Sequence, residues 1–289
     1  MNGASAAPRL VTYLPPAKRF DWSNLGVRVL SATVLVPVVL GAIWADQPPL
    51  NWLFLIMLAV AVALLAIEWA GMSAPLAPIR VAFVVALAVL TGLFIADTGA
   101  TALAWAATSI GAVTAALIAR GVAERPADAA LGVIYIGVPG LCLIWLRSTD
   151  QGQWWTLMLF AITWSADIAA YAVGNALKGP KLWPRFSPNK TWSGFFGGLL
   201  AAMVTGALVA AQARFQLNLT AAAFVGLAGG LATMGGDLWE SMLKRRFGVK
   251  DSGDLIPGHG GLLDRVDGLM FAVVIIAGAR LVNHLGWGH

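Results

Sequence analysis

The residues of this chain that are best suited to chemistry lie between Ser241 and Asp267, where bases, carboxylates, glycines and a histidine are crowded together. Long apolar segments flank this run on both sides. Hydrocarbon does not solvate charge, so such a cluster must lie at the rim of a membrane or line a wet cavity inside it. Chemistry on the head group of a lipid would take place at that depth.

Aspartates form the core of this pattern. Asp237 is expected to close a glycine-rich helix, where the missing side chains allow close helix contact or access for a ligand. Asp264 and Asp267 share a face at the start of the last helix, with Arg265 turned elsewhere. Three aspartates at one rim predict a Mg²⁺ site, because this ion prefers a few carboxylate oxygens together with substrate phosphates. A second cation is left open.

The helix that carries Asp237 presents further polar groups. Asp237, Ser241 and Lys244 or Arg245 follow one another at helical spacing and therefore share one face. The alternative to a metal site is a structural network in which the acids only pair with neighbouring bases.

Two acids lie in or beside other apolar segments. Asp167 interrupts such a segment, where an unpaired and dry carboxylate is costly, so we expect it to complete a polar cavity. Glu68, at the end of an earlier segment, is interpreted as an interfacial cap rather than as a cavity residue.

Two polar loops are predicted on the same side of the membrane, at 178–193 and 246–263. The first contains three prolines, which exclude a continuous helix. Its residues 187–191 cluster hydroxyl, amide and ammonium donors just before the next helix, where backbone N–H groups favour an anion. In the second, His259 is flanked by glycines that let the backbone approach a ligand. The simpler interpretation is a basic loop that records topology and a histidine without a role.

The composition describes an integral membrane protein. Of the 289 residues, 59% are hydrophobic and 11% are charged, and the mean hydropathy is +0.77. A spanning helix needs about 20 mostly apolar residues. We therefore predict an all-α polytopic bundle of about nine helices, with a polar cavity open to the cytosol, at 29–44, 50–71, 81–96, 101–118, 129–147, 154–176, 194–213, 219–237 and 266–284.

The domain organisation follows from these segments. Residues 1–28 form a polar N-terminal arm without the features of a cleavable signal, and residues 29–289 form one membrane domain. Cys142 is the only cysteine, which excludes disulfides and cysteine metal sites as organising devices.

The distribution of Lys and Arg predicts the orientation. With a cytosolic N-terminus, sixteen of the nineteen bases face the cytosol, and the three on the other side are Arg147, Arg214 and Arg280. The net charge of +5 therefore reports topology and attraction to anionic lipid. Nucleic-acid binding is not expected, because the bases are spread over several membrane loops.

The run from Ser241 to Asp267 resembles the signature of the phosphatidate cytidylyltransferases, or CDP-diacylglycerol synthases. In that family Ser-x-x-Lys-Arg is followed by Lys-Asp, by Pro-Gly-His-Gly-Gly and by Asp-Arg-x-Asp. An upstream stretch is also similar and comprises Asp167, Ala170, Tyr171, Gly174 and residues 187–191. The detailed resemblance covers roughly residues 160–270. The chain departs from it at Ser193, where many members carry a glutamate, so no acid acts at that loop position here.

The resemblance implies transfer of a cytidylyl group from CTP to phosphatidate, which gives CDP-diacylglycerol and pyrophosphate. Mg²⁺ is the implied cofactor, with Asp237, Asp264 and Asp267 as its ligands. The expected catalytic residues are Asp167, Asp237, Lys244, Asp264 and Asp267. The expected substrate-binding residues are Ser187, Asn189, Lys190, Thr191, Ser241, Arg245, Lys250, Asp251, His259, Gly260 and Arg265.

The expected partners are CTP, phosphatidate, membrane lipids and a second copy of the chain in a homodimer, and the expected location is the bacterial inner membrane. Two other classes share parts of this pattern. A related CTP-dependent polyprenol or dolichol kinase would have the same membrane layout. An ion-coupled transporter would also carry buried aspartates and glycine-broken helices, but it usually shows repeated halves, whereas the polar residues here lie in the C-terminal part.

Overall fold

The computed structural model of the chain describes residues 33–34, 36–45, 52–121, 125–184, 187–212, 217–253, 255 and 260–285. Eight helices in this part are long and apolar enough to cross a membrane. They are α2 (Leu53–Ser73), α3 (Pro78–Asp97), α4 (Thr101–Ile118), α5 (Ala127–Ser148), α6 (Gly152–Leu177), α7 (Trp192–Gln212), α8 (Leu219–Arg246) and α9 (Leu263–His284).

The predicted helical bundle is thus confirmed for the described residues. The first predicted segment, 29–44, is described only in part and is helical at 33–34 and 36–44. The predicted arm at 1–28 lies outside the described residues.

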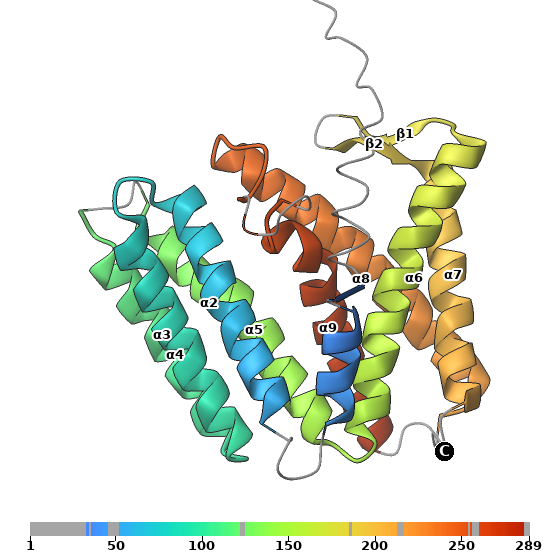
Figure 1. The fold of residues 1–289 in the computed structure, drawn as a ribbon, viewed down its shortest axis with the longest axis horizontal. Coiled ribbons are helices and arrows are strands. Elements are labelled where there is room, and N and C mark those ends of the chain that lie inside the picture. The colour runs from blue at the N-terminus through green and yellow to red at the C-terminus, as the bar shows by residue number, and fades with distance from the viewer. Residues whose placement is uncertain are drawn as a thin grey trace, which may run out of the picture.

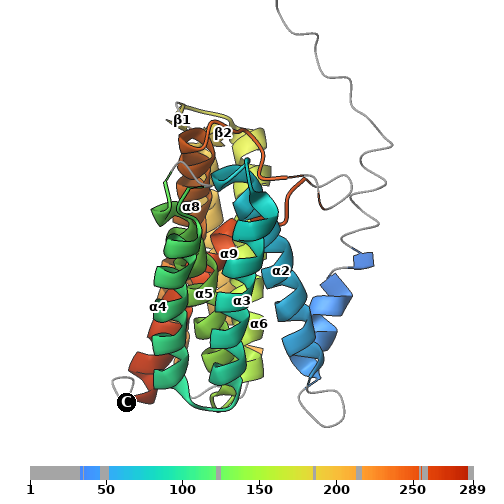
Figure 2. The ribbon, with the colours of Figure 1, turned by 90° about the vertical axis from the view of Figure 1, so that its left-hand side faces the viewer.

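Helix α9 lies in the middle of the bundle, with α2–α5 on one side and α6 and α7 on the other, while α8 runs obliquely past it (Figure 1). It packs against α5, α6 and α8. Consecutive helices run in opposite directions, as short connections require (Figures 1 and 2). The end of α8 and the start of α9 therefore meet at the same end of the molecule.

A small antiparallel hairpin marks that end. Strand β1 (Lys181–Trp183) pairs with β2 (Ser187–Thr191) between α6 and α7, with Lys181 opposite Thr191. The prolines of this loop exclude a helix, as expected, but they do not prevent a short two-stranded pairing. We refer to this end of the bundle as the hairpin end (Figure 1).

The basic residues divide between the two ends as predicted, within the described ranges. Arg147 and Arg280 lie near the ends of α5 and α9 that are remote from the hairpin. The remaining described Lys and Arg residues lie at the hairpin end.

Helix α8 corrects the prediction for Asp237. The apolar pattern places this residue at the end of a segment at 219–237, but α8 continues to Arg246. Leu243 is buried in the extension, and three bases in the last turn interact favourably with the negative end of the helix dipole. Asp237 therefore lies inside a continuous helix rather than closing one.

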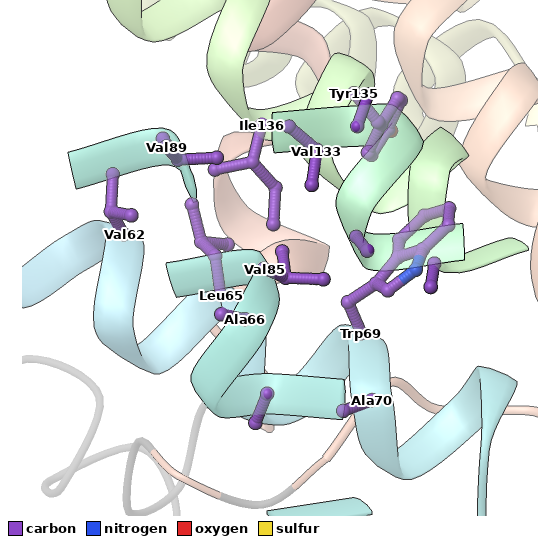
Figure 3. Close-up of a cluster of buried hydrophobic side chains, with 14 of the residues drawn as sticks. Val62, Leu65, Ala66, Trp69, Ala70, Val85, Val89, Val133, Tyr135 and Ile136 are labelled. Carbon is purple, nitrogen blue, oxygen red and sulfur yellow. The ribbon is translucent and has the colours of Figure 1, made fainter. Parts of the chain in front are cut away.

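Buried side chains of α2, α3 and α5 form a tight core on one side of the bundle (Figure 3). Trp69 of α2 is fully buried in it, and its indole N–H donates to the backbone oxygen of Asp128 over 2.9 Å. Tyr135 and Phe247 pack against the same indole ring. The C-terminal end of α2 is thus held firmly against α5.

Candidate functional site

Two glycines bring α8 and α9 together at the hairpin end. A Cβ atom on Gly236 would lie 2.4 Å from the backbone oxygen of Asp267 and 2.9 Å from Cα of Gly268. A Cβ atom on Gly268 would lie 2.7 Å from Thr233. Only glycine permits this approach, and it sets Asp237 of α8 next to Asp267 of α9.

Asp237 and Asp267 form the first part of the site. Asp237 lies against the start of α9, because its Oδ1 atom would be 3.3 Å from a Cβ atom on Gly268, the residue after Asp267, and Asp267 is buried. Two carboxylates this close repel each other unless a proton or a cation neutralises one charge. Lys190 of β2 reaches across from the hairpin and forms an ion pair with Asp237.

The second part of the site lies nearer the end of α8. The Lys244 ammonium is 2.8 Å from Glu240 Oε2 and 2.7 Å from Asp264 Oδ1. Asp264 Oδ2 also accepts from the backbone N–H of Ser252 over 3.4 Å. Lys244 therefore joins α8 to α9, and Asp264 joins α9 to the preceding loop.

Asp167 of α6 is also close to the first part. It lies within electrostatic reach of Asp237, Lys190 and Arg265. Arg265 is exposed on α9, and its positive charge acts on Asp167 together with that of Lys190.

The other hairpin residues support the start of α7. Thr191 is buried, and its hydroxyl accepts from the backbone N–H of Gly194 over 3.2 Å. The Ser193 hydroxyl donates to the backbone oxygen of Lys178. At this position the serine therefore joins the start of α7 to the residue that follows α6. Ser187 is half-buried and Asn189 is exposed.

Several predicted binding residues lie outside this cluster. Arg245 is exposed, and its side chain donates to the backbone oxygen of Val249 over 3.4 Å. Lys250 and Asp251 are exposed on the loop, and His259 lies outside the described residues. Ser241, half-buried on α8, follows Asp237 by one turn.

Gly260, another predicted binding residue, has a positive φ of 81°. An L side chain would be strained in that conformation, so this turn favours glycine. A Cβ atom there would lie 3.6 Å from Asp264 Oδ2, which places the turn next to the second part of the site.

The three aspartates are not gathered into one group. Among the described residues, no three Asp, Glu, His or Cys side chains have an arrangement that could hold a metal ion by themselves. Asp237 and Asp267 meet where α8 and α9 approach at Gly236 and Gly268, while Asp264 faces Lys244. A pair of carboxylates still suits Mg²⁺, which takes one or two of them and completes its shell with water and substrate phosphates. A cavity of about 500 Å³ lies at the opposite end, beside Asp97 and Arg147.

Sequence reasoning missed one acid at this end, Glu240, and did not predict the burial of a second, Glu68. Glu240 is buried, and its Oε1 atom has no hydrogen-bond partner. Its spacing of four residues before Lys244 on one helix could have signalled the pair. Glu68, interpreted from the sequence as an interfacial cap, is buried and caps a helix other than its own. No local pattern could have indicated that partner.

The bundle and its charged rim define the class: a polytopic helical membrane protein with acids and bases gathered at one end of its spans. The chain belongs to the cytidylyltransferase family, whose model matches residues 26–281.

Individual relatives agree with this assignment. A phosphatidate cytidylyltransferase of Brucella melitensis is 40% identical over 261 residues, which cover 88% of this chain and 92% of the relative. Proteins of the same name from Rickettsia conorii and Staphylococcus haemolyticus are each 37% identical and match 52% of this chain, covering 67% and 58% of their own lengths.

Proposed function

We propose that this protein transfers a cytidylyl group from CTP to phosphatidate. A phosphate oxygen of phosphatidate attacks the α-phosphorus of CTP, the bond from that phosphorus to the bridging oxygen breaks, and pyrophosphate leaves with CDP-diacylglycerol as the other product. The family membership and the names of the relatives support this activity.

One observation carries the proposal within the chain: Asp237 meets Asp267 and Lys190 at a glycine contact between two helices. Both substrates are polyanions, so the reaction needs positive charge where they meet and where pyrophosphate departs. An acidic pair beside a lysine is suited to that need, because the acids hold a cation and the lysine holds phosphate oxygens.

In this proposal Asp237 and Asp267 hold Mg²⁺, which would neutralise phosphate charge when bound. Lys190 lies on the hairpin next to Asp237 and can turn from the carboxylate to a phosphate oxygen. Lys244, held between Glu240 and Asp264 in the second part of the site, supplies a second ammonium group nearer the end of α8. The phosphate of phosphatidate is ionised at neutral pH and needs little help from a general base.

The hairpin end is proposed to face the cytosol, in the inner membrane of a bacterium. The excess of described bases at that end supports this orientation. CTP would then reach a polar cavity at the rim from the cytosol, while the acyl chains of phosphatidate stay in the lipid.

The direct test is an assay of the purified full chain with CTP, phosphatidate and Mg²⁺. Release of pyrophosphate together with CDP-diacylglycerol is expected. Formation of CDP and a phosphorylated lipid alcohol from a polyprenol, with no reaction on phosphatidate, would contradict the proposal.

A further inference from the structure

Glu68 of α2 makes contacts that no part of the proposed chemistry uses. Its side chain is only 3% exposed. Oε1 accepts from the backbone N–H of Leu262 and Oε2 from that of Leu263, both over 2.7 Å. Oε2 also accepts from the Ser252 hydroxyl over 3.4 Å. One carboxylate thus joins Ser252, in the loop after α8, to the start of α9.

The contact supplies what the N-cap position of helix α9 lacks. The residue at its N-cap is Leu262, and it makes no capping hydrogen bond with its side chain. The first N–H groups of a helix have no partner within the helix, and a carboxylate there also interacts favourably with the helix dipole. Glu68 supplies both effects from a helix far away in the sequence.

The surroundings are built to admit this side chain. A Cβ atom on Gly261 would lie 3.0 Å from Glu68 Oε2 and 1.9 Å from the Ser252 hydroxyl, and one on Gly253 would lie 3.2 Å from Glu68 Cγ. The next residue of α2, Trp69, is fully buried and bonded to α5. The backbone that carries Glu68 is therefore held in place, and the carboxylate has little freedom to move.

The contact leads directly to the acids of the site. Ser252, which donates its hydroxyl to Glu68, also donates its backbone N–H to Asp264. Leu263, bonded to Glu68, immediately precedes Asp264 and lies one turn before Asp267. A shift of this turn would move both aspartates relative to α8.

We propose that Glu68 is a positioning residue: its carboxylate fixes the start of α9 and the loop at Ser252, and so sets where Asp264 and Asp267 stand against α8. It touches no substrate. The inference rests on the proposed function in its reference to Mg²⁺ and CTP.

The test compares the purified full chain with Glu68→Gln, which keeps the size of the side chain but presents an NH₂ group to one of the two N–H donors. Misplaced cation ligands should raise the Mg²⁺ concentration at half-maximal rate and lower kcat, together by about 10–100-fold, the range typical of groups that orient metal ligands. A merely structural role would reduce the amount of active protein and leave the Mg²⁺ midpoint unchanged. A Mg²⁺ midpoint is also measured without turnover. It is the Mg²⁺ concentration that gives half of the maximal rise in melting temperature in the presence of α,β-methylene CTP.

Two further variants keep the test decisive. Ser252→Ala removes only the weaker contact, so it should fold and shift the Mg²⁺ midpoint in the same direction by less. Asp128→Asn breaks the contact of another buried acid at the same end, to the more exposed Arg246, and should lower the melting temperature without moving the midpoint. If Glu68→Gln folds and its Mg²⁺ midpoint is unchanged, the inference is overturned. If Glu68→Gln does not fold, an unchanged midpoint in Ser252→Ala overturns it instead. A shift in Asp128→Asn as large as that in the Glu68 variant would also overturn it. Wild-type protein that releases no pyrophosphate would instead overturn the proposed function, while the melting titration would still decide the role of Glu68.

Discussion

Acids and bases alternate along the contact between α8 and α9. Asp237 faces Asp267 and Lys190, and two turns further along α8 Lys244 lies between Glu240 and Asp264. Each lysine thus stands beside carboxylates that fix its position. Because the two groups are separate, we expect their members to affect different steps of substrate use.

The two aspartates that pair with lysines should give different kinetic signatures. Asp237→Asn removes one of two facing carboxylates, so kcat should fall by about 10²-fold or more and the Mg²⁺ requirement should rise. Asp264→Asn removes one of the two carboxylates that hold Lys244, so it should mainly raise KM for CTP or phosphatidate. Asp97→Asn, exposed at the other end of the bundle, serves as the control. Saturation curves in Mg²⁺ and in each substrate measure both effects, and normal Mg²⁺-dependent turnover in Asp237→Asn would exclude the metal assignment.

Lys190 is predicted to hold phosphate and to compete with Mg²⁺ for Asp237. Lys190→Ala should raise KM for CTP, while its Mg²⁺ requirement should stay the same or fall, because Asp237 loses its resident cation. Lys190→Arg keeps the charge as a planar fork and should restore only part of the activity. Lys181→Ala, on the other strand of the hairpin, is the matched control. Wild-type CTP kinetics in Lys190→Ala would remove the lysine from the site.

The candidate residues could be found from the sequence because a charged side chain inside an apolar membrane segment is costly and usually has a function. Asp167, Asp237, Asp264 and Asp267 all lie in the halves of their helices that are nearer the hairpin end. Their grouping could not be found, since spacing along one helix does not say which residue of the next helix stands opposite. Arg245 illustrates the limit. Its spacing from Ser241 suits the same helix face as well as that of Lys244 does, but its side chain donates to the backbone oxygen of Val249 in the loop.

At the scale of helices, the glycine contact between α8 and α9 decides the geometry of the site. Gly236→Ala would place its Cβ 2.4 Å from the backbone oxygen of Asp267. Backbone cannot yield as a flexible side chain does, so the helices must separate, at a cost of about 1–3 kcal/mol. We expect a lower melting temperature and a loss of activity.

Gly235→Ala is the matched control, one residue away on the same helix. A Cβ atom on Gly235 meets nothing within 4 Å among the described residues, and alanine favours a helix over glycine by about 0.5–1 kcal/mol. Its melting temperature should equal or exceed that of the wild type, with activity retained. Equal losses in both variants would show that the close helix contact is not what the site requires.

Most helices could be predicted because long apolar runs have few alternatives to spanning. The predicted segment 101–118 coincides with α4, and 154–176 differs from α6 by two residues at its start and one at its end. The extension of α8 was harder, because its last turns are amphipathic and only tertiary contacts bury Leu243. The hairpin was missed for a similar reason: prolines exclude a helix but do not specify a strand partner.

For the whole molecule, the segregation of bases and the alternation of helices together predict which ends share a compartment. The loop between α2 and α3 and the loop before α9 both lie at the hairpin end, whereas the start of α8 and the end of α3 lie at the other end. The proposed reaction requires the hairpin end to face cytosolic CTP. This arrangement can be tested without any assay of activity.

Single cysteines placed in a Cys142→Ala background should react with a membrane-impermeant maleimide from one side only. Leu76→Cys and Leu255→Cys, both exposed at the hairpin end, should be labelled in inverted vesicles and protected in intact spheroplasts. Thr98→Cys and Asn218→Cys, exposed at the opposite end, should show the reverse pattern. Labelling of Leu76→Cys and Leu255→Cys from opposite sides would contradict the alternation of the helices. Labelling of both from outside the cell would agree with the fold but place the acids on the side of the membrane without CTP. That result would contradict the proposed reaction.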